Sequence, residues 1–173
     1  MKRILIVVDM QNDFISGSLG NGRAEKIVPR VAEKLTAARE RGDLIVYTQD
    51  THEENYLESF EGKHLPVSHC VRGGSGIEIH PSLAPEANDI VLEKPTFGAI
   101  RLPALLKPYM EADTVLELCG LCTDICVVSN ALLLRAHYPN HEIVVDAAAC
   151  AGVTPESHDA ALTTMRACQI DVV

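Results

Sequence analysis

The chain has 173 residues, of which 47% are hydrophobic and 23% are charged, a composition usual for one soluble globular domain. The formal net charge of −9 argues against binding to nucleic acid or to anionic membrane surfaces. No apolar run is long enough to span a membrane, and the N-terminus lacks a signal-peptide layout. Six cysteines without a secretory signal predict reduced thiols and a cytoplasmic location.

Short apolar runs alternate with helical patterns along the whole chain. The predicted strands are Arg3–Val8, Leu44–Thr48, Asp89–Glu93, Val115–Cys119, Glu142–Val145 and Ile170–Val173. The predicted helices are Ala24–Arg41, Leu102–Met110, Ile125–Leu134 and a last helix with Thr154 as N-cap and Pro155 as its first residue. This alternation predicts a doubly wound, mostly parallel α/β sheet in one domain, residues 1–173. Residues 51–88 are polar and rich in Gly, Pro and His, and an insertion of that length is usually functional.

Four chemically reactive side chains stand at or just after the ends of predicted strands. Asp9 follows the first strand, Asp50 the second and Lys94 the third, and Cys126 lies shortly after the fourth. Because the carboxyl ends of parallel strands meet at one edge, where such sheets bind ligands, these groups should converge. Each alone would mean little, so it is their conjunction that predicts a site.

A thiol near the start of an apolar helix suits nucleophilic catalysis. The unpaired N–H groups and the helix dipole at Cys126, together with the charge of Lys94, favour the thiolate. Asp9 would move the proton, and N–H groups of the turn 120–126 would hold an oxyanion. The alternatives remain that Cys126 only packs, that Asp9 and Lys94 form a surface ion pair, and that Asp50 is a turn residue.

Two segments carry a family resemblance. They are Val8-Asp9-Met10-Gln11-Asn12-Asp13-Phe14 and Gly120-Leu121-Cys122-Thr123-Asp124-Ile125-Cys126-Val127, with Lys94 after the third strand. Together they resemble the isochorismatase-like cysteine hydrolases. The resemblance implies a three-layer α/β/α fold with strand order 3-2-1-4-5-6, and an Asp9–Lys94–Cys126 triad. It also implies a homo-oligomer and a cis peptide before Cys122, which would aim the N–H groups of Cys122 and Cys126 at the oxyanion. Cys122 departs from the small residue, often Ala, that is usual there.

The insertion at about 50–88 contains candidate metal ligands. Asp50-Thr51-His52 and His69 offer one carboxylate and two imidazoles, which suit Zn²⁺, Fe²⁺ or Mn²⁺ with positions left open. With the glycines of residues 73–76, this arrangement is similar to that of nicotinamidases, whose metal holds the pyridine nitrogen of nicotinamide. Glu61 is the candidate further ligand. Its rivals are Glu54 and Glu58, and a solvated acidic loop is the alternative; His64 and His80 are expected to be structural or exposed.

The resemblance also identifies a departure in the expected substrate pocket. The family often places a Trp before the second metal histidine, but this chain has no Trp, and Leu65-Pro66-Val67 stands there. Phe14, Phe97 and Leu121 are the expected substrate contacts.

The favoured function is a cysteine amidohydrolase, a nicotinamidase of NAD salvage that converts nicotinamide and water to nicotinate and ammonia through a thioester on Cys126. Another amide or carbamoyl hydrolase of the superfamily is the alternative. The spacing of Cys119, Cys122 and Cys126 also permits a metal or redox cluster, although no fourth ligand follows at finger-like spacing. A catalytically inactive interaction module is the remaining alternative.

Overall fold

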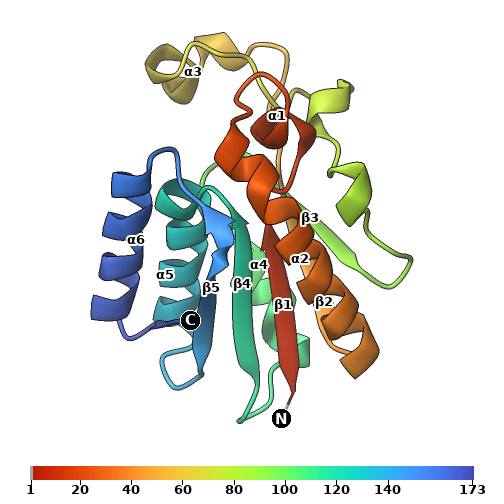
Figure 1. Ribbon diagram of the computed structural model, residues 1–173, viewed down its shortest axis with the longest axis vertical. Coiled ribbons are helices and arrows are strands. Elements are labelled where there is room, and N and C mark those ends of the chain that lie inside the picture. The colour runs from red at the N-terminus through yellow and green to blue at the C-terminus, as the bar shows by residue number, and fades with distance from the viewer. Residues whose placement is uncertain (1) are drawn as a thin grey trace.

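The computed structural model describes residues 2–173. Its centre is a six-stranded sheet of order β3-β2-β1-β4-β5-β6 in which every neighbouring pair is parallel (Figure 1). The strands are β1 Arg3–Val8, β2 Leu44–Asp50, β3 Ile90–Lys94, β4 Val115–Leu121, β5 Ile143–Ala151 and β6 Asp171–Val172. The strand order predicted from the resemblance is confirmed.

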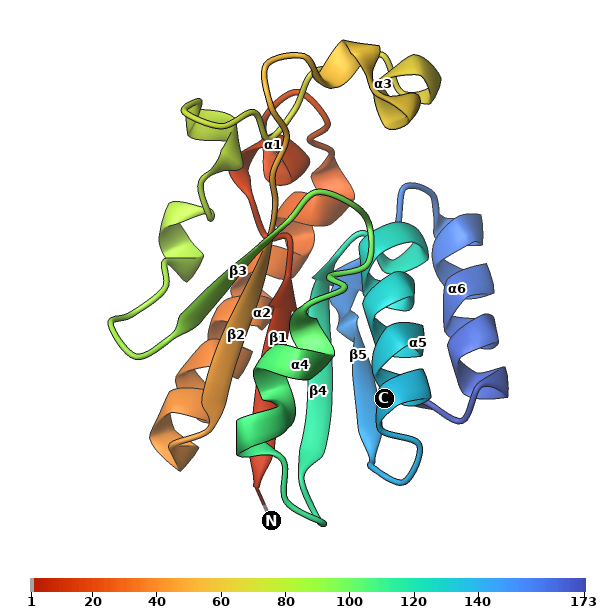
Figure 2. The same cartoon turned by 180° about the vertical axis from the view of Figure 1, so that it is seen from behind.

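Helices cover both faces of the sheet, which makes the three layers predicted. Helix α2 lies on one face, and α4, α5 and α6 lie on the other (Figures 1 and 2). The helices are α1 Asn12–Ile15, α2 Gly22–Arg41, α3 Phe60–His64, α4 Leu102–Leu106, α5 Val128–His137 and α6 Pro155–Ala167. Among residues 2–173, no helix combines the length and the apolar character needed to cross a bilayer.

The helix and strand patterns explain why these segments fold as they do. The aliphatic residues of β1 from Ile4 to Val8 are buried, as expected of a strand covered on both faces. Helix α2 buries the stripe that contains Ile27, Val31 and Leu35, and Gly42 ends it in a left-handed conformation, φ 73°. Thr154 caps α6 as predicted, by accepting a hydrogen bond from the Ser157 N–H.

Several element boundaries differ from the prediction. Strand β5 does not end at Asp146 but continues to Ala151, past an irregularity opposite Leu118 and Gly120 of β4. The helix predicted over 102–110 divides into α4 and a 3₁₀ turn, Lys107–Tyr109, because a proline stands at the start of that turn. Helix α1, one turn long, was not predicted, because its four residues are too few to show a periodicity.

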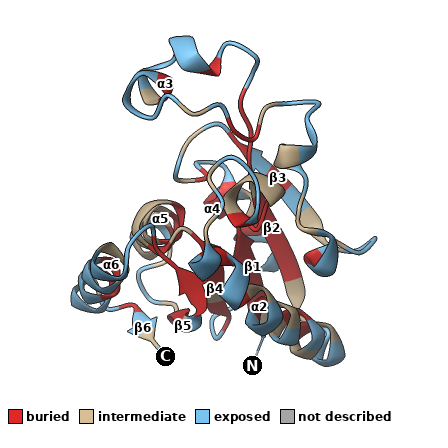
Figure 3. Ribbon diagram, turned by 45° about the horizontal axis from the view of Figure 1, so that its top comes forward, coloured by how far each residue is buried: buried red, intermediate tan, exposed pale blue. Residues whose placement is uncertain are grey.

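Residues 51–88 form an excursion above the carboxyl edge of the sheet. It contains α3 and short 3₁₀ turns, and most of its side chains are exposed (Figure 3). Its last part is tied to the body, because Asn12 N–H donates to the Glu78 carbonyl and His80 N–H donates to that of Met10, each at 2.9 Å. These backbone hydrogen bonds therefore attach the excursion to the residues that follow β1.

Candidate active site

The site begins where the last residues of β1 pair with Gly120 of β4. Gly120 pairs with Val8, and a Cβ at Gly120 would lie 2.1 Å from the Val8 carbonyl oxygen. Its φ of +120° also strains any residue with a side chain. Only glycine fits there, and β4 can then carry the turn that holds Cys126 to the end of β1. Asp9 follows directly, itself in a left-handed conformation with φ 49°.

Lys94 stands at the centre of a buried cluster of reactive groups. Its Nζ lies 2.7 Å from Asp9 Oδ2, 3.1 Å from Asp50 Oδ1 and 3.4 Å from Cys126 Sγ. The Thr48 hydroxyl donates to the other Asp9 oxygen at 2.7 Å. The Lys94 and Asp9 side chains are each 1% exposed, so the alternative of a surface ion pair is wrong. The structure thus brings Asp9, Lys94 and Cys126 together.

Burial opposes the ionisation that was expected of the thiol. It raises the pKa of Cys126 well above its usual value; the Asp9 charge adds to this rise, and Lys94 opposes it. Burial also raises the pKa of Asp9, with Lys94 again opposing. Desolvation and the Lys94 cation therefore act in opposite directions on the thiol, and desolvation is the larger effect on its pKa. The thiol and the Asp9 carboxylate thus both face the Lys94 ammonium.

Cys126 lies in a π-helical turn, Thr123–Val127, that precedes α5 rather than in the first turn of that helix. The N–H groups of Ile125 and Val127 donate to the Cys122 carbonyl at 3.1 and 3.0 Å. From the start of α5, the Asn130 amide donates to the Cys126 carbonyl at 2.8 Å. A wider turn thus brings the thiol to the edge of the sheet.

The predicted cis peptide before Cys122 is wrong. Residues 2–173 contain no cis peptide, and Cys122 has an extended backbone, φ −85° and ψ 146°. An extended residue passes from β4 into the turn in the trans form and avoids the cost of a non-proline cis bond, about 3 kcal/mol. The oxyanion roles of the Cys122 and Cys126 N–H groups stay a prediction.

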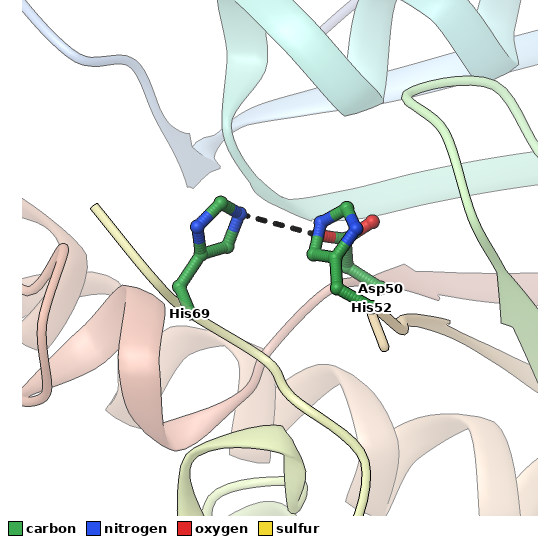
Figure 4. Close-up of side chains that lie close together, drawn as sticks. All are labelled: Asp50, His52 and His69. Carbon is green, nitrogen blue, oxygen red and sulfur yellow. Dashed lines mark hydrogen bonds and ion pairs between the residues drawn. The ribbon is translucent and has the colours of Figure 1, made fainter. Parts of the chain in front are cut away.

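Asp50, His52 and His69 converge beside the triad, with donor atoms within 4.8 Å of one another. Figure 4 shows both imidazoles turned toward the Asp50 carboxylate, whose Oδ2 lies 2.9 Å from His52 Nε2 and 3.5 Å from His69 Nε2. His69 Nδ1 donates to the Val67 carbonyl at 2.8 Å, so in the neutral ring Nε2 carries the lone pair. A second-sphere carbonyl of this kind is usual behind a metal-ligating histidine, and the donor set fits a divalent ion.

Glu61 approaches the same group from α3. Its Oε1 lies 3.8 Å from the Nε2 atoms of both His52 and His69, and its side chain is 21% exposed. Burial raises the pKa of Glu61, and the Asp50 charge adds to that rise. Glu54 and Glu58 are exposed, and so is His64, which bonds the Phe60 carbonyl, whereas His80 is half-buried and caps a 3₁₀ turn. Of the three candidate glutamates, only Glu61 faces the imidazoles.

Asp50 joins the two clusters because it uses one oxygen in each. Oδ1 accepts from Lys94, and Oδ2 faces the histidines. Burial alone would raise its pKa, but the contacts of Oδ2 with His52 and His69 and the charge of Lys94 hold the pKa of Asp50 well below its usual range. Asp50 is therefore an ionised carboxylate shared between thiol chemistry and metal-type donors, not a turn residue.

A cavity of about 220 Å³ opens onto both clusters. Cys126, Asp50 and His69 line it together with Phe14, Leu19, Asn21, Glu61, Leu65, Phe97, Cys122, Ile125 and Val153. Phe14 and Phe97 thus lie where contacts were predicted. Leu65, from the segment that stands where the family often has a Trp, also lines the cavity. Leu121 does not line the cavity: it is 1% exposed and packs in the core, because it is still part of β4. Val153 was missed, although its place just after β5 could have indicated it.

The cysteines do not form a cluster of their own. All six are free, and Cys119 is fully buried in β4. Within residues 2–173, the only group of three or more potential ligands is Asp50, His52 and His69. The alternative of a Cys119–Cys122–Cys126 metal site therefore finds no support.

The sequence-family model of the isochorismatase domain matches residues 3–173 of the chain. The chain belongs to the isochorismatase family. Its relatives include a nicotinamidase of Acinetobacter baylyi, 29% identical over 83% of this chain and 79% of that protein.

Two solved structures of the isochorismatase fold superpose well on this chain. The zinc-bound pyrazinamidase of Pyrococcus horikoshii superposes with a TM-score of 0.87 and 30% identity, covering 100% of this chain and 99% of its own. The N-carbamoylsarcosine amidase of Thermoplasma acidophilum superposes with a TM-score of 0.83 and 31% identity, covering 99% and 95%.

Proposed function

We propose that this protein is a cysteine amidohydrolase that converts nicotinamide and water to nicotinate and ammonia. The observation that carries the proposal is the shared cavity: Cys126 lies on its wall together with Asp50, His69 and Glu61. A volume of about 220 Å³ is below the range for drug-sized ligands, so the site suits one small ring. The nicotinamidase and pyrazinamidase among the relatives support the same substrate class.

The triad performs the amide chemistry in two halves. Asp9 accepts the thiol proton as Cys126 Sγ attacks the carbonyl carbon, and the N–H groups of Cys122 and Cys126 stabilise the oxyanion. The C–N bond then breaks, Asp9 returns the proton to the leaving ammonia, and a thioester remains on Cys126. Asp9 next takes a proton from water, which attacks the thioester and releases nicotinate and the thiol. Lys94 keeps its charge throughout and balances the thiolate.

Asp50, His52, His69 and Glu61 are the residues that would hold a divalent ion at the cavity wall. When bound, that ion supplies a Lewis-acid contact for the pyridine nitrogen; zinc is favoured, with iron and manganese as the alternatives. The apolar side chains of Phe14, Phe97 and Leu65 then surround the pyridine ring. We include a cytoplasmic location and a homo-oligomer in the proposal. Free cysteines support the first, and exposed apolar side chains such as Phe60 and Ile100 support the second.

Hydrolysis of a carbamoyl group is the second candidate. The resemblance to N-carbamoylsarcosine amidase favours it, because the same triad would cleave either amide.

Ammonia release from nicotinamide, benzamide and N-carbamoylsarcosine, measured on the zinc-loaded protein, separates these candidates. Nicotinamide should be the best substrate. The Cys126→Ser protein is the control for background hydrolysis. Turnover of N-carbamoylsarcosine without turnover of nicotinamide would replace the first proposal by the second.

A further inference from the structure

Gln11 is a fully buried amide whose hydrogen-bonding atoms are directed at the backbone of Asp50. Its Oε1 accepts from the Asp50 N–H at 2.7 Å, and its Nε2 donates to the Asp50 carbonyl at 2.8 Å. The second Nε2 proton goes to the Ile77 carbonyl at 2.8 Å. One side chain thus pairs both main-chain groups of a single residue, as the adjacent strand of a sheet would.

The sheet explains why Asp50 needs this partner. On one side it pairs with Lys94 of β3. On the other side β1 has already ended, because Val8 pairs with Thr48 and the chain turns away at Asp9. Buried backbone groups without partners cost free energy. The Gln11 amide therefore completes the ladder one step beyond β1.

We propose that Gln11 is a positioning residue for the Asp50 carboxylate. Asp50 holds Lys94 with one oxygen and faces His52 and His69 with the other, so its backbone position sets both contacts. Gln11 N–H also donates to the Asp9 carbonyl at 2.8 Å, which links the clamp to the chain turn at the end of β1. The catalytic meaning of this role rests on the proposed function, whereas the effect on metal affinity does not.

The chain offers a matched control. Gln49 is half-buried, and its Nε2 donates to the same Ile77 carbonyl, at 2.8 Å. Its side chain makes no hydrogen bond to the Asp50 backbone among residues 2–173. Gln49→Met therefore loosens the attachment of the 75–80 segment but leaves the clamp on Asp50 in place.

The test measures zinc affinity, by competition with a chromogenic chelator, together with the melting temperature. Gln11→Met should raise the zinc Kd about 10- to 100-fold, the usual effect of losing an outer-sphere support. Gln49→Met should leave the Kd close to that of the wild type. Gln11→Glu keeps the shape of the side chain and the acceptor for Asp50 N–H, so it should raise the Kd less than Gln11→Met does.

Equal zinc Kd values for Gln11→Met and Gln49→Met would overturn the proposal, because both would then act through the 75–80 segment. If Gln11→Met does not fold, a wild-type Kd in the folded Gln11→Glu protein overturns it equally. A protein that binds zinc with the expected pattern but does not hydrolyse nicotinamide would refute the proposed function and leave the role of Gln11 standing.

Discussion

The triad and the metal-type donors lie side by side but are positioned in different ways. Asp9 directly follows β1 in the middle of the sheet, and Lys94 is the last residue of the edge strand β3; both are buried. His52 and His69 come from the excursion, which is held by hydrogen bonds within it and by Asp13 of α1. His52 N–H donates to the Cys70 carbonyl at 3.0 Å, and the Cys70 N–H donates to Asp13 Oδ2 at 2.8 Å. The sheet therefore positions Asp9, Lys94 and the Asp50 donor, whereas the two histidine donors depend on a few hydrogen bonds of the excursion.

The largest expected effect is on turnover, and it comes from replacing the nucleophile, which should leave the metal donors unaffected. Cys126→Ser should lower kcat at least about a thousandfold, as loss of a nucleophile does in comparable enzymes, because the alcohol is a far weaker nucleophile than the thiol. Zinc binding should not change, since Cys126 is not among the converging donors. Ammonia release and zinc titration are the measurements, and Cys168→Ser, at the half-exposed end of α6, is the matched control. Near-normal turnover by Cys126→Ser would refute the mechanism.

His52→Ala tests the other region. The variant should lose bound metal and raise the KM for nicotinamide by at least about 10-fold, because a direct ligand matters no less than an outer-sphere one. Benzamide, which has no ring nitrogen, should be affected much less. Alkylation of Cys126 by iodoacetamide should keep its wild-type rate, because Lys94 contacts Asp9 and Asp50 rather than His52.

Elemental analysis and activity with and without a chelator complete this measurement. Amidase activity that is indifferent to chelator and to His52→Ala would contradict the nicotinamidase assignment and leave a metal-independent amidase.

Lys94→Met tests, within the triad, how strongly the Lys94 charge affects the Cys126 thiol. Lys94 lowers the pKa of the Cys126 thiol against burial, so removing it should raise that pKa further. The rate of alkylation should then begin to rise at a higher pH and be slower near neutrality. An unchanged pH profile would mean that the 3.4 Å contact between Nζ and Sγ has no electrostatic effect.

The smallest expected effect lies on the excursion itself. Phe60 in α3 is 80% exposed, so Phe60→Ala should change the free energy of unfolding by no more than about 0.5 kcal/mol. Leu118 in β4 is fully buried, and Leu118→Ala should cost about 2–5 kcal/mol. Denaturant titration gives both values. Similar losses for the two variants would show that the excursion is packed as firmly as the sheet.

The sequence predicted the sheet well because short runs rich in β-branched residues, such as Arg3–Val8, favour buried strands, and parallel topology then brings their ends together. Asp9 and Lys94 were found in this way, since position along a strand is a local property. His69 required the family resemblance, because no periodicity marks a residue in a loop.

Other features depend on packing that no local pattern contains. The balance between burial and Lys94 at the Cys126 thiol follows from the three-dimensional surroundings of the sulfur. The π-helical turn and the trans peptide at Cys122 are backbone details that the residue types alone left open. Gln11 could be quoted as part of a motif, but its partner lies 39 residues away and appears only in the fold.

The two oxygens of Asp50 have a consequence for how such an enzyme can diverge. A substitution of Asp50 that adapts the metal donors to a different ion also changes the electrostatic field at Lys94, because this one carboxylate serves both. Substitutions in contact through a shared group are not additive in their energies. A change at Asp50 therefore alters the metal preference and the surroundings of the Cys126 thiol together. A variant that changes one of these properties needs a compensating substitution to keep the other.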